Sequence, residues 1–548
     1  MDSVKIRELE EKTTLEPTDV VVIEDYDGTK VVSVKNLRSS VQQALFFDTI
    51  ADMKAATLNE GDVVRTLGYH SVNDGGAATY LIQYAPAEVD NGITIHYLDT
   101  SDTLRAHLVT NGFINPLQAG AYGDGVHNDY SVLNKMIKMK LDIEFPAKDF
   151  YIGENLYLKL NSDSKINFNN AILSGTGGIE LGLDEACDDI YIENLIMKGT
   201  SIRLDSLASY IHINNCKFYS NTGVEIHGAT GVYIRDSIFG TKDAPAETPI
   251  YMNSGSNIYI GYCSMNFTNI GVNIATYPCE SATADNWAKR VSVRACTFNG
   301  TGKTKSYGVR MGSVKQIAVI DACVVHNTDI AVGLNPNAEL NLSISDIAMT
   351  DCNIGFSTNG GAVAETAKLH LSGLIEFTPA DKGDTRSYLF DLGGAYIIND
   401  ASYKLDGGGG VHVGLARSNN TVYTKDSHSD LGDKLINGSD NMYSDGFLDL
   451  GAWDEKYPAF NMSVVVNSPN GYIKNISTVD CDHLGGSVGF KGYTGQIISL
   501  YSENRTKLKL NQENGNIKWD NYNDEMSLNE NTPVKIKYNG AYWYVIEY

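Results

Sequence analysis

A short phrase recurs nine times between about Asn167 and Phe377, and it restricts the folds that this chain can adopt. The phrase reads apolar, polar, apolar, two mostly polar residues, one small or apolar residue, one variable residue and usually a last apolar one. Successive copies lie about 25 residues apart, within the period of roughly 20–50 residues that is typical of solenoids. The sixth positions of the phrase are Ala171, Leu195, Cys216, Ser237, Cys263, Cys296, Cys323, Cys352 and Leu374.

Apolar and polar residues alternate within each copy, which is the period of a strand rather than a helix. A second short strand usually follows the phrase, as in G-V-E-I-H at 223–227 and G-V-N-I at 271–274. Coils of this kind stack at roughly 4.8 Å, and a single coil cannot bury its apolar face alone. We therefore predict an all-β fold, a right-handed single-stranded parallel β-helix running from about Leu141 to Phe377.

Five of the eight cysteines occupy the sixth position of the phrase, so we expect one inward column of cysteines. A small, easily buried side chain suits such a column. Disulfides are an alternative, because neighbouring coils bring Cα atoms within bonding range, but stacked side chains point the same way. No Cys-x-x-Cys or paired-histidine spacing occurs, so we expect neither a metal site nor a cofactor.

The charge and hydropathy of the chain exclude several classes of partner. The net charge of −24 argues against nucleic acid, which requires surfaces rich in Lys and Arg. No apolar run reaches the roughly 20 residues of a membrane span, so we expect no membrane insertion. The charged stretch from Met1 to Glu11 does not have the pattern of a signal peptide.

Residues 1–45 predict a hairpin followed by a helix. The strands Val20–Glu24 and Lys30–Val34 are joined by Asp27-Gly28, a strong turn signal. The layout K-I-R-E-L, D-V-V-V-I and G-T-K-V-V-S-V resembles the amino-terminal virion-anchoring segment of bacteriophage tail fibres and tailspikes. That resemblance implies that residues 1–45 bind a phage tail or baseplate protein.

Residues 46–112 predict a small α+β domain with little sign of chemistry. A helix, the strand G-D-V-V and the stretch G-Y-H-S-V-N-D-G-G-A-A-T-Y resemble the domain that precedes the β-helix in many phage tailspikes. Gly68, Gly75 and Gly76 are expected in turns, and Tyr80 in the core. Asp74 fits a turn residue better than a catalyst.

Residues 113–145 carry the most specific motif, G-A-Y-G-D-G-V-H-N-D at 120–129. This resembles the entry segment of the pectate-lyase-like superfamily, in which a helix after the motif caps the first coil. Asn128 or Asp129 can cap that helix, which carries Val132, Leu133, Met136 and Ile137 on one face. We therefore expect structural roles for Asp124 and Asp129, and we assign residues 113–380 to the β-helix with its capping helix.

Together these resemblances are to a receptor-binding phage tailspike. The resemblance implies a homotrimer in the virion tail, which is made in the host cytoplasm and acts outside the cell. Proteins of this kind bind, and often cleave, host cell-surface polysaccharide. Residues 381–440 are expected to form a linker or irregular end of the solenoid. For residues 441–548 we predict a β-sandwich ending in a hairpin at Asn539-Gly540, serving as a trimer clamp or in glycan binding.

Function on a β-helix has to lie on outward positions, because the inward positions are apolar. Two long segments, Gly240–Thr248 and Thr276–Arg290, are expected to leave opposite ends of one strand and to flank a groove. In this groove Glu225 is the first catalytic candidate, with Glu247 and Asp285 as partners and Asp205 or Asp236 in reserve. The predicted substrate-binding residues are Trp287, Tyr251, Tyr233, Tyr259, His227 and Arg203.

Three functions remain open from the sequence. Glycoside hydrolysis needs two carboxyl groups beside the bond, and the groove could supply them. A polysaccharide lyase would use a base with arginines that neutralise a uronate, for which Arg203, Arg235, Arg294 and Arg310 are available. A purely adhesive fibre needs neither, and then Glu225 would form a surface ion pair with Arg203. The outward aromatic column of Tyr191, His212, Tyr233 and Tyr259 would then be a subunit interface or an ordinary exposed ladder.

Overall fold

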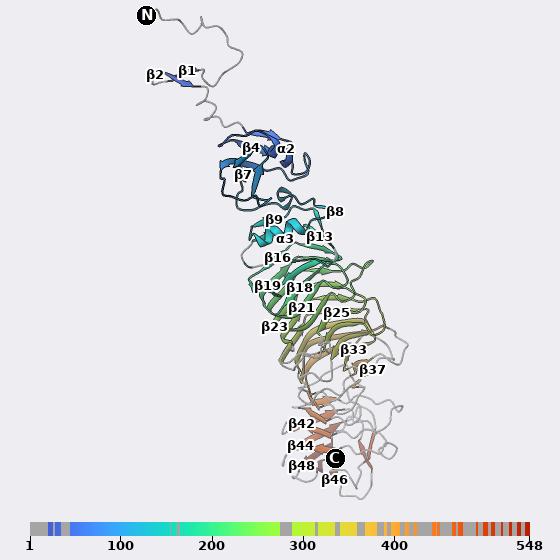
Figure 1. The fold of residues 1–548 in the computed structure, drawn as a ribbon. Helices are drawn as coiled ribbons and strands as arrows, with labels where there is room; N and C mark the ends of the chain where they lie inside the picture. The colour runs from blue at the N-terminus through green and yellow to red at the C-terminus, as the bar shows by residue number, and fades with distance from the viewer. Residues whose placement is uncertain are drawn as a thin grey trace, which may run out of the picture. The chain divides into compact units, whose positions relative to one another are not determined.

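The structure of the chain is a computed structural model (Figure 1). The structure describes residues 20–25, 28–33, 44–153, 155–160, 162, 165–274, 288–312, 316–334, 340–358, 368–380, 388–391, 396–405, 412–415, 421–424, 441–444, 447–449, 463–466, 470–474, 489–491, 497–501, 506–509, 517–518, 525–528, 534–538 and 543–547. The chain divides into two compact units, Met1–Gly123 with Ser131–Glu144, and Asp124–Tyr130 with Phe145–Tyr548.

The first unit starts with the predicted hairpin. Strands β1 (Val20–Asp25) and β2 (Gly28–Ser33) pair antiparallel, with Asp25 opposite Gly28. Gly28 is therefore the first residue of β2, whereas the sequence placed it in the turn. The helix predicted after the hairpin lies outside the described residues.

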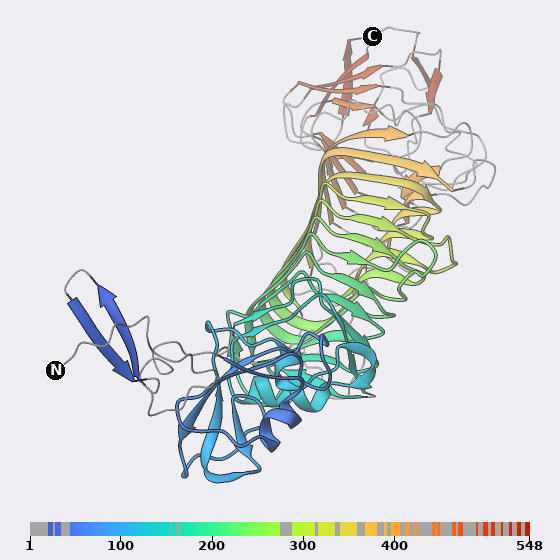
Figure 2. The ribbon, with the colours of Figure 1, turned by 90° about the horizontal axis from the view of Figure 1, so that it is seen from above.

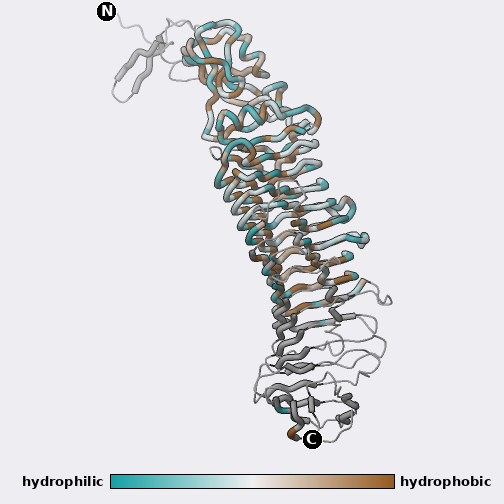
Figure 3. Tube along the Cα trace, turned by 60° about the horizontal axis from the view of Figure 1, so that its bottom comes forward, coloured by the Kyte–Doolittle hydropathy of each residue, from teal (hydrophilic) through white to brown (hydrophobic). Residues whose placement is uncertain are grey.

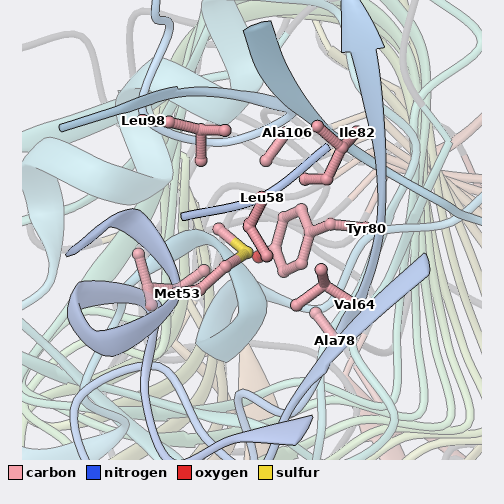
Figure 4. Close-up of a cluster of buried hydrophobic side chains, with 9 residues drawn as sticks. Met53, Leu58, Val64, Ala78, Tyr80, Ile82, Leu98 and Ala106 are labelled. Carbon is pink, nitrogen blue, oxygen red and sulfur yellow. The ribbon is translucent and has the colours of Figure 1, made fainter. Parts of the chain in front are cut away.

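A five-stranded mixed sheet and one helix form the predicted α+β domain. The strand order is β3 (Leu45–Phe47), β4 (Val63–Thr66), β5 (Thr79–Tyr84), β7 (Ser101–Leu108) and β6 (Ile95–Leu98). Helix α2 (Ile50–Ala55) begins with a capping box between Thr49 and Asp52. Its Met53 packs with Val64, Tyr80 and Ile82 in a fully buried core (Figure 4).

Asp74 is a turn residue, as predicted. Its carboxylate accepts hydrogen bonds from the backbone N–H groups of Tyr69, His70, Ser71 and Gly76. Burial raises the pKa of Asp74, but these four N–H donors outweigh burial and lower it below the ordinary value. The carboxylate is therefore committed to the turn.

The predicted entry segment forms the 3-10 helix η2 (Pro116–Ala119), strand β8 (Asp124–Asn128) and helix α3 (Tyr130–Lys138). Asp124 accepts from the N–H groups of Val126 and His127, and the His127 contact does most to lower its pKa to about 2. Asn128 Oδ1 accepts from the N–H of Tyr130 at the start of α3. These contacts agree with a structural role for Asp124. That α3 covers the first coil stays a prediction.

The second unit is a parallel β-solenoid, whose stacked coils are visible in Figure 2. The first half of the repeated phrase forms sheet 1, its last residues form sheet 2, and the strand that follows forms sheet 3. Sheet 1 comprises β16 (Tyr191–Glu193), β19 (Ala208–Asn214), the later part of β21 (Val224–Arg235) and of β23 (Ile250–Gly261), β26 (Lys289–Arg294), β29 (Gln316–Asp321) and the first parts of β32 (Leu340–Cys352) and β34 (Lys368–Pro379), whose later residues continue sheet 2.

In sheets 2 and 3, as in sheet 1, strands of successive coils pair in parallel. Sheet 2 comprises β10 (Asp149–Ile152), β13 (Ile172–Gly175), β17 (Ile196–Lys198), β20 (Lys217–Tyr219), β22 (Ile238–Phe239), β24 (Ser264–Asn266), β27 (Thr297–Asn299) and β30 (Val324–His326). Sheet 3 comprises β11 (Tyr157–Lys159), β14 (Gly178–Leu181), β18 (Ser201–Asp205), the first parts of β21 and β23, β25 (Ile270–Ile274), β28 (Tyr307–Met311), β31 (Ile330–Leu334), β33 (Ile354–Ser357), β35 (Tyr388–Asp391) and β37 (His412–Leu415).

Each coil bends between sheets 1 and 2 at the fifth position of the phrase. The backbone there is left-handed, with φ of 57° at Asn194, 52° at Asn215 and 51° at Asp236. Asn and Asp tolerate this conformation better than other L-residues because their short polar side chains form local hydrogen bonds. The side chains also stack, with Asn215 Nδ2 donating to Asn194 Oδ1 at 2.6 Å.

The sixth position points inward over most of the solenoid, as predicted. The side chains from Ala171 to Cys323 in this column are at most 2% exposed, and the apolar and polar residues alternate along the coils in Figure 3. Each cysteine Sγ donates to the carbonyl two residues earlier, for example Cys296 to Arg294 O at 3.2 Å. Burial raises the pKa of Cys216 to about 12. Six cysteines in the described residues are free thiols.

Two members of the predicted column are wrong. Ile344 pairs with Ile320, and Met349 pairs with Val325. Ile347, three residues after Ile344, therefore occupies the position in its coil that Cys323 occupies in the coil before. Cys352 is buried one corner further along, with its Sγ 3.3 Å from Thr328 Oγ1. Leu374 is 41% exposed, because β34 has one more residue than β32 at this corner and buries Ile375 instead.

Parallel pairing continues past the predicted end of the solenoid at 380. It runs from β34 through β36 (Tyr396–Leu405), β38 (Thr421–Thr424), β39 (Asn441–Ser444) and β41 (Ser463–Val466) to β43 (Gly489–Lys491). The sequence missed these coils because their strands no longer carry the phrase.

The last strands form two further sheets. One contains β40 (Phe447–Asp449), β42 (Asn470–Lys474), β44 (Ile497–Tyr501), β48 (Val534–Tyr538), β49 (Trp543–Glu547) and β46 (Ile517–Lys518); the other pairs β45 (Thr506–Lys509) with β47 (Glu525–Leu528). Strands β48 and β49 pair antiparallel with Tyr538 opposite Trp543, which confirms the predicted last hairpin. Within the described part of the chain, no helix is long and apolar enough to cross a membrane.

Candidate functional site

Outward side chains of sheet 3 line up in one column, which we call the Glu225 column. Backbone register places its six members on consecutive coils, and the flanking residues of each strand, such as Ile202 and Val224, are fully buried. The column consists of Glu180, Arg203, Glu225, Tyr251, Asn273 and Arg310. The alternation of the strands therefore turns a row of charged and polar groups away from the core, of which Glu180 and Asn273 are buried and the other four are partly exposed.

Arg203 is held by two acidic side chains. Its Nε lies 2.9 Å from Asp205 Oδ2 and its second guanidinium nitrogen 3.2 Å from Asp205 Oδ1, a bidentate pair. Glu180 Oε1 lies 3.9 Å from the same Nε. The hydrogen bond to Asp205 is the largest cause of the raised pKa of Arg203. Asp205 is 7% exposed, so the contact favours a structural role for this predicted catalytic residue.

Glu225 pairs with His227 rather than with Arg203. Its Oε2 lies 3.3 Å from His227 Nε2, and the side chain keeps 33% of its surface exposed. The His227 hydrogen bond is the main cause that lowers the pKa of Glu225; burial opposes it, and the charge of Arg203 adds to it. Glu225 is consequently a carboxylate at neutral pH, which suits a base or a nucleophile.

Tyr251 lies beside this pair, whereas Tyr233 and Tyr259 lie on another sheet. The ring centroids of Tyr251 and His227 are 6.0 Å apart. Tyr233 is on sheet 1, beyond the corner of β21 that contains the left-handed residues Gly228 and Gly231. There it stacks with His212 at 4.8 Å, and Arg235 lies 4.7 Å over the ring of Tyr259. The structure therefore separates the predicted binding residues into two groups.

The predicted groove walls do not belong to one strand. Residues 240–248 precede β23, whereas residues 275–287 follow β25, the strand of the next coil. Glu247 is exposed, and its backbone N–H and carbonyl bond to Asn221, Asn269 and Ile270 at a corner of the coil. It lies four residues before Tyr251, at most about 14 Å along the chain. Asp285 and Trp287 lie outside the described residues.

Three residues of this site were missed as candidates from the sequence. Glu180 occupies the third position of G-I-E-L at 178–181, which matches the Arg203 and Glu225 positions of S-I-R-L and G-V-E-I, so the repeat itself held the signal. Asn253 contacts His227, and Ser254 contacts Asn253; the alternation placed Asn253 outward, but it did not predict these contacts. In the described part of the chain, no three His, Cys, Asp or Glu side chains form a group that could hold a metal ion.

No protein-family model and no curated protein matches the chain. Among solved structures, the fold is similar to the gp42 tailspike of Acinetobacter phage vb_AbaP_AS12, with a TM-score of 0.42, 11% identity, and 84% of this chain and 75% of that chain covered. The chain is similar in fold to phage tailspikes. A second such structure is tailspike protein gp49 of Acinetobacter baumannii bacteriophage Fri1, a capsular polysaccharide depolymerase. Its TM-score is 0.38 at 11% identity, and the match covers 91% of this chain and 94% of that chain. A third is the enzymatically active domain of tailspike protein 2 of bacteriophage CBA120. Its TM-score is 0.41 at 12% identity, and the match covers 79% of this chain and 63% of that chain.

Proposed function

We propose that the protein is a phage tailspike that binds host cell-surface polysaccharide and depolymerises it by glycoside hydrolysis on sheet 3. The observation that carries the proposal is the Glu225 column. It places a partly exposed carboxylate on a rigid strand, between an arginine on the coil below and a tyrosine on the coil above. The resemblance of residues 120–129 to the entry segment of pectate-lyase-like proteins supports the same reading.

Glu225 fits one of the two roles that glycoside hydrolysis requires. One carboxyl group must act as base or nucleophile and the other as acid, about 5–5.5 Å apart for retention or about 6.5–9.5 Å for inversion. The lowered pKa of Glu225 favours the base or nucleophile. Because Asp205 is tied to Arg203, we propose Glu247 or Asp285 as the acid. Tyr251 and Trp287 would stack on sugar rings.

The decisive experiment incubates the protein with a panel of purified bacterial capsular polysaccharides. We expect new reducing ends, and we expect Glu225→Gln to lower their rate of formation by about 10²–10⁴-fold, as loss of an acid–base group does. Glu193→Gln, on the outward face of sheet 1, is the matched control and should keep full activity. A Glu225→Gln protein that folds and cleaves at the wild-type rate would remove Glu225 from the mechanism. Glu247→Gln and Asp285→Asn test the acid in the same way.

Arg310 favours a second candidate function, a polysaccharide lyase on the same face. Its guanidinium belongs to the Glu225 column, three coils above Glu225, and its buried Nε has no hydrogen-bond partner among the residues that the structure describes. An arginine there could neutralise a uronate while a base removes a proton. Cleavage with an unsaturated-uronate absorbance would favour this function, and binding without cleavage would favour an adhesive fibre.

We extend the proposal to the architecture and the assembly. Parallel crossover connections are right-handed in about 98% of cases, which supports a right-handed solenoid. The last two sheets would pack as a β-sandwich that clamps a homotrimer or binds glycan. Residues 1–45 would attach the protein to a phage tail or baseplate protein, so that the protein is located in the virion tail.

A further inference from the structure

A chain of four hydrogen-bonded side chains ends at Glu225. Ser254 Oγ donates to Asn253 Oδ1 at 2.8 Å, and Asn253 Nδ2 lies 2.9 Å from His227 Nδ1. His227 Nε2 in turn lies 3.3 Å from Glu225 Oε2. All four side chains are half-buried, so the chain lies at the edge of solvent, where a substrate can reach its end.

The placement of the Asn253 amide gives the direction of these hydrogen bonds. Its nitrogen faces His227 Nδ1, and an amide nitrogen can only donate, so in this orientation Nδ1 accepts and carries no proton. The ring proton of a neutral His227 is then on Nε2, which faces the Glu225 carboxylate. The hydroxyl of Ser254 donates to the amide oxygen in the same orientation.

A local irregularity of the solenoid brings Asn253 to this place. Ile226 pairs with Met252, but the next residue, His227, pairs with Ser254, so β23 has one additional residue, Asn253, at this point. A second register shift occurs below it, where Asp205 pairs with both His227 and Gly228. Bulges of this kind re-aim side chains and are frequent beside active sites. Here the bulge turns Asn253 toward the imidazole on the neighbouring coil.

The groups around Glu225 come from three coils. Arg203 faces it from β18 but is bound bidentately by Asp205, and Tyr251 faces it from β23. His227 is the neighbour on its own strand and supplies the hydrogen bond that does most to lower the pKa of Glu225. Ser201 on β18 also hydrogen-bonds to Glu225, but the pKa of Glu225 depends chiefly on His227.

We propose that Asn253 and Ser254 hold His227 as the neutral tautomer with its proton on Nε2, and that this tautomer positions Glu225 Oε2 as the reacting carboxylate. His227 and Asn253 are then positioning residues. The inference rests on the proposed function, since it assigns a catalytic role to Glu225.

The kinetic test compares two substitutions of His227 on the polysaccharide that the wild-type protein cleaves. His227→Ala should lower kcat/KM by about 10–100-fold, as expected for a misplaced catalytic group. His227→Gln should restore much of this loss, because its amide can donate to Glu225. His326→Gln, on β30 of sheet 2, is the matched control and should be neutral.

The pH profile separates positioning from a merely structural role. In His227→Ala the main cause of the lowered Glu225 pKa is gone while burial remains, so the acid limb of kcat/KM should move to higher pH. In His227→Gln it should stay near the wild-type position. An acid limb that His227→Ala leaves in place overturns the inference, even if the rate falls.

The tautomer can be measured without activity, which separates the inference from the proposed function. Solid-state NMR of ¹⁵N-histidine-labelled protein, with His227→Gln to assign the signal, should show neutral His227 with an Nε2 proton at pH 7. Asn253→Asp should instead place an acceptor opposite Nδ1 and so favour a proton on that nitrogen. If His227 of the wild-type protein carries a proton on Nδ1 at pH 7, as the other tautomer or as the imidazolium, the inference is wrong while the proposed function stands. Failure of the wild-type protein to cleave any polysaccharide overturns the proposed function. It also overturns the catalytic role of the four hydrogen-bonded side chains that end at Glu225.

Discussion

At the residue scale, the corner of the phrase shows how single positions shape the solenoid. Asn194, Asn215 and Asp236 suit its left-handed backbone, but Ala295 and Ala322 adopt it too, with φ of 50° and 51°. A residue with a Cβ loses roughly 1–2 kcal/mol in this conformation, and Asn loses less. These two alanines are therefore places where the sequence departs from the local preference of the fold.

We expect Ala322→Asn to raise the free energy of unfolding by about 1 kcal/mol. Ala322 is exposed, so the new side chain meets solvent and can bond its own backbone. Urea denaturation at neutral pH measures the change. The reverse substitution, Asn194→Ala, is the control and should destabilise, since it also removes the hydrogen bond from Asn215. An Ala322→Asn protein that is less stable than wild type would contradict this account of the corner.

At the element scale, strand patterns predict where coils lie but not every register. The phrase predicted sheets 1 and 2 up to Cys323, because the alternation recurs on both sides of the same left-handed corner, which is Asn or Asp as far as Asp236. It failed in β32, since this 13-residue strand contains two overlapping stretches that both fit the phrase. The additional residue in β34 left no mark in the alternation either, so Leu374 was assigned inward.

The candidate site shows the same limit. Position along the strands was enough to predict that Arg203, Glu225 and Tyr251 share an outward face. The pairing of Arg203 with Asp205 rather than Glu225 depends on side-chain rotamers, and the approach of Asn253 to His227 depends on a bulge. Neither has a periodic signature, so sequence patterns could not predict them.

His96 makes the small amino-terminal domain sensitive to pH. It lies on β6, is 2% exposed, and within the described part of the chain its Nε2 has no hydrogen-bond partner. Burial is the main cause that lowers its pKa, with Lys54 and Lys135 adding to it and Asp90 and the backbone of Ile93 opposing it. The unfolded chain therefore binds a proton more readily than the folded domain. The stability from this group is complete above the ordinary pKa of 6.5 and declines as the pH falls below it.

Hydrogen exchange of the whole protein at pH 7 and pH 5 can measure this effect. After correction for intrinsic rates, β5, β6 and β7 should lose protection at pH 5, whereas sheet 1 of the solenoid serves as the internal control. His96→Gln should remove the difference between the two pH values, because it cannot titrate. Equal protection of the wild-type domain at both pH values would show that His96 does not control its stability.

At the scale of the whole molecule, each strand of the solenoid pairs with strands of the coils before and after it. The last coil has no following coil, so its strands leave an open edge. Such edges invite pairing with other chains unless something covers them. Parallel pairing continues to β43, so a truncation at 441 would cut through the ladder and expose β38. A cut after residue 491 leaves the ladder intact and removes most of the six-stranded sheet that we propose as part of the trimer clamp.

We expect the full-length chain to be a homotrimer at micromolar concentration, and we expect deletion of residues 492–548 to shift it toward the monomer. The physical reason is that β44, β48 and β49 form the sheet to which we assign the clamp, while the ladder up to β43 can still fold. Deletion of residues 1–43 is the matched control and should leave the trimer unchanged. Light scattering gives the number of chains in each particle. A monomeric full-length protein would contradict the homotrimer, and a trimeric 1–491 protein would place its contacts on the solenoid.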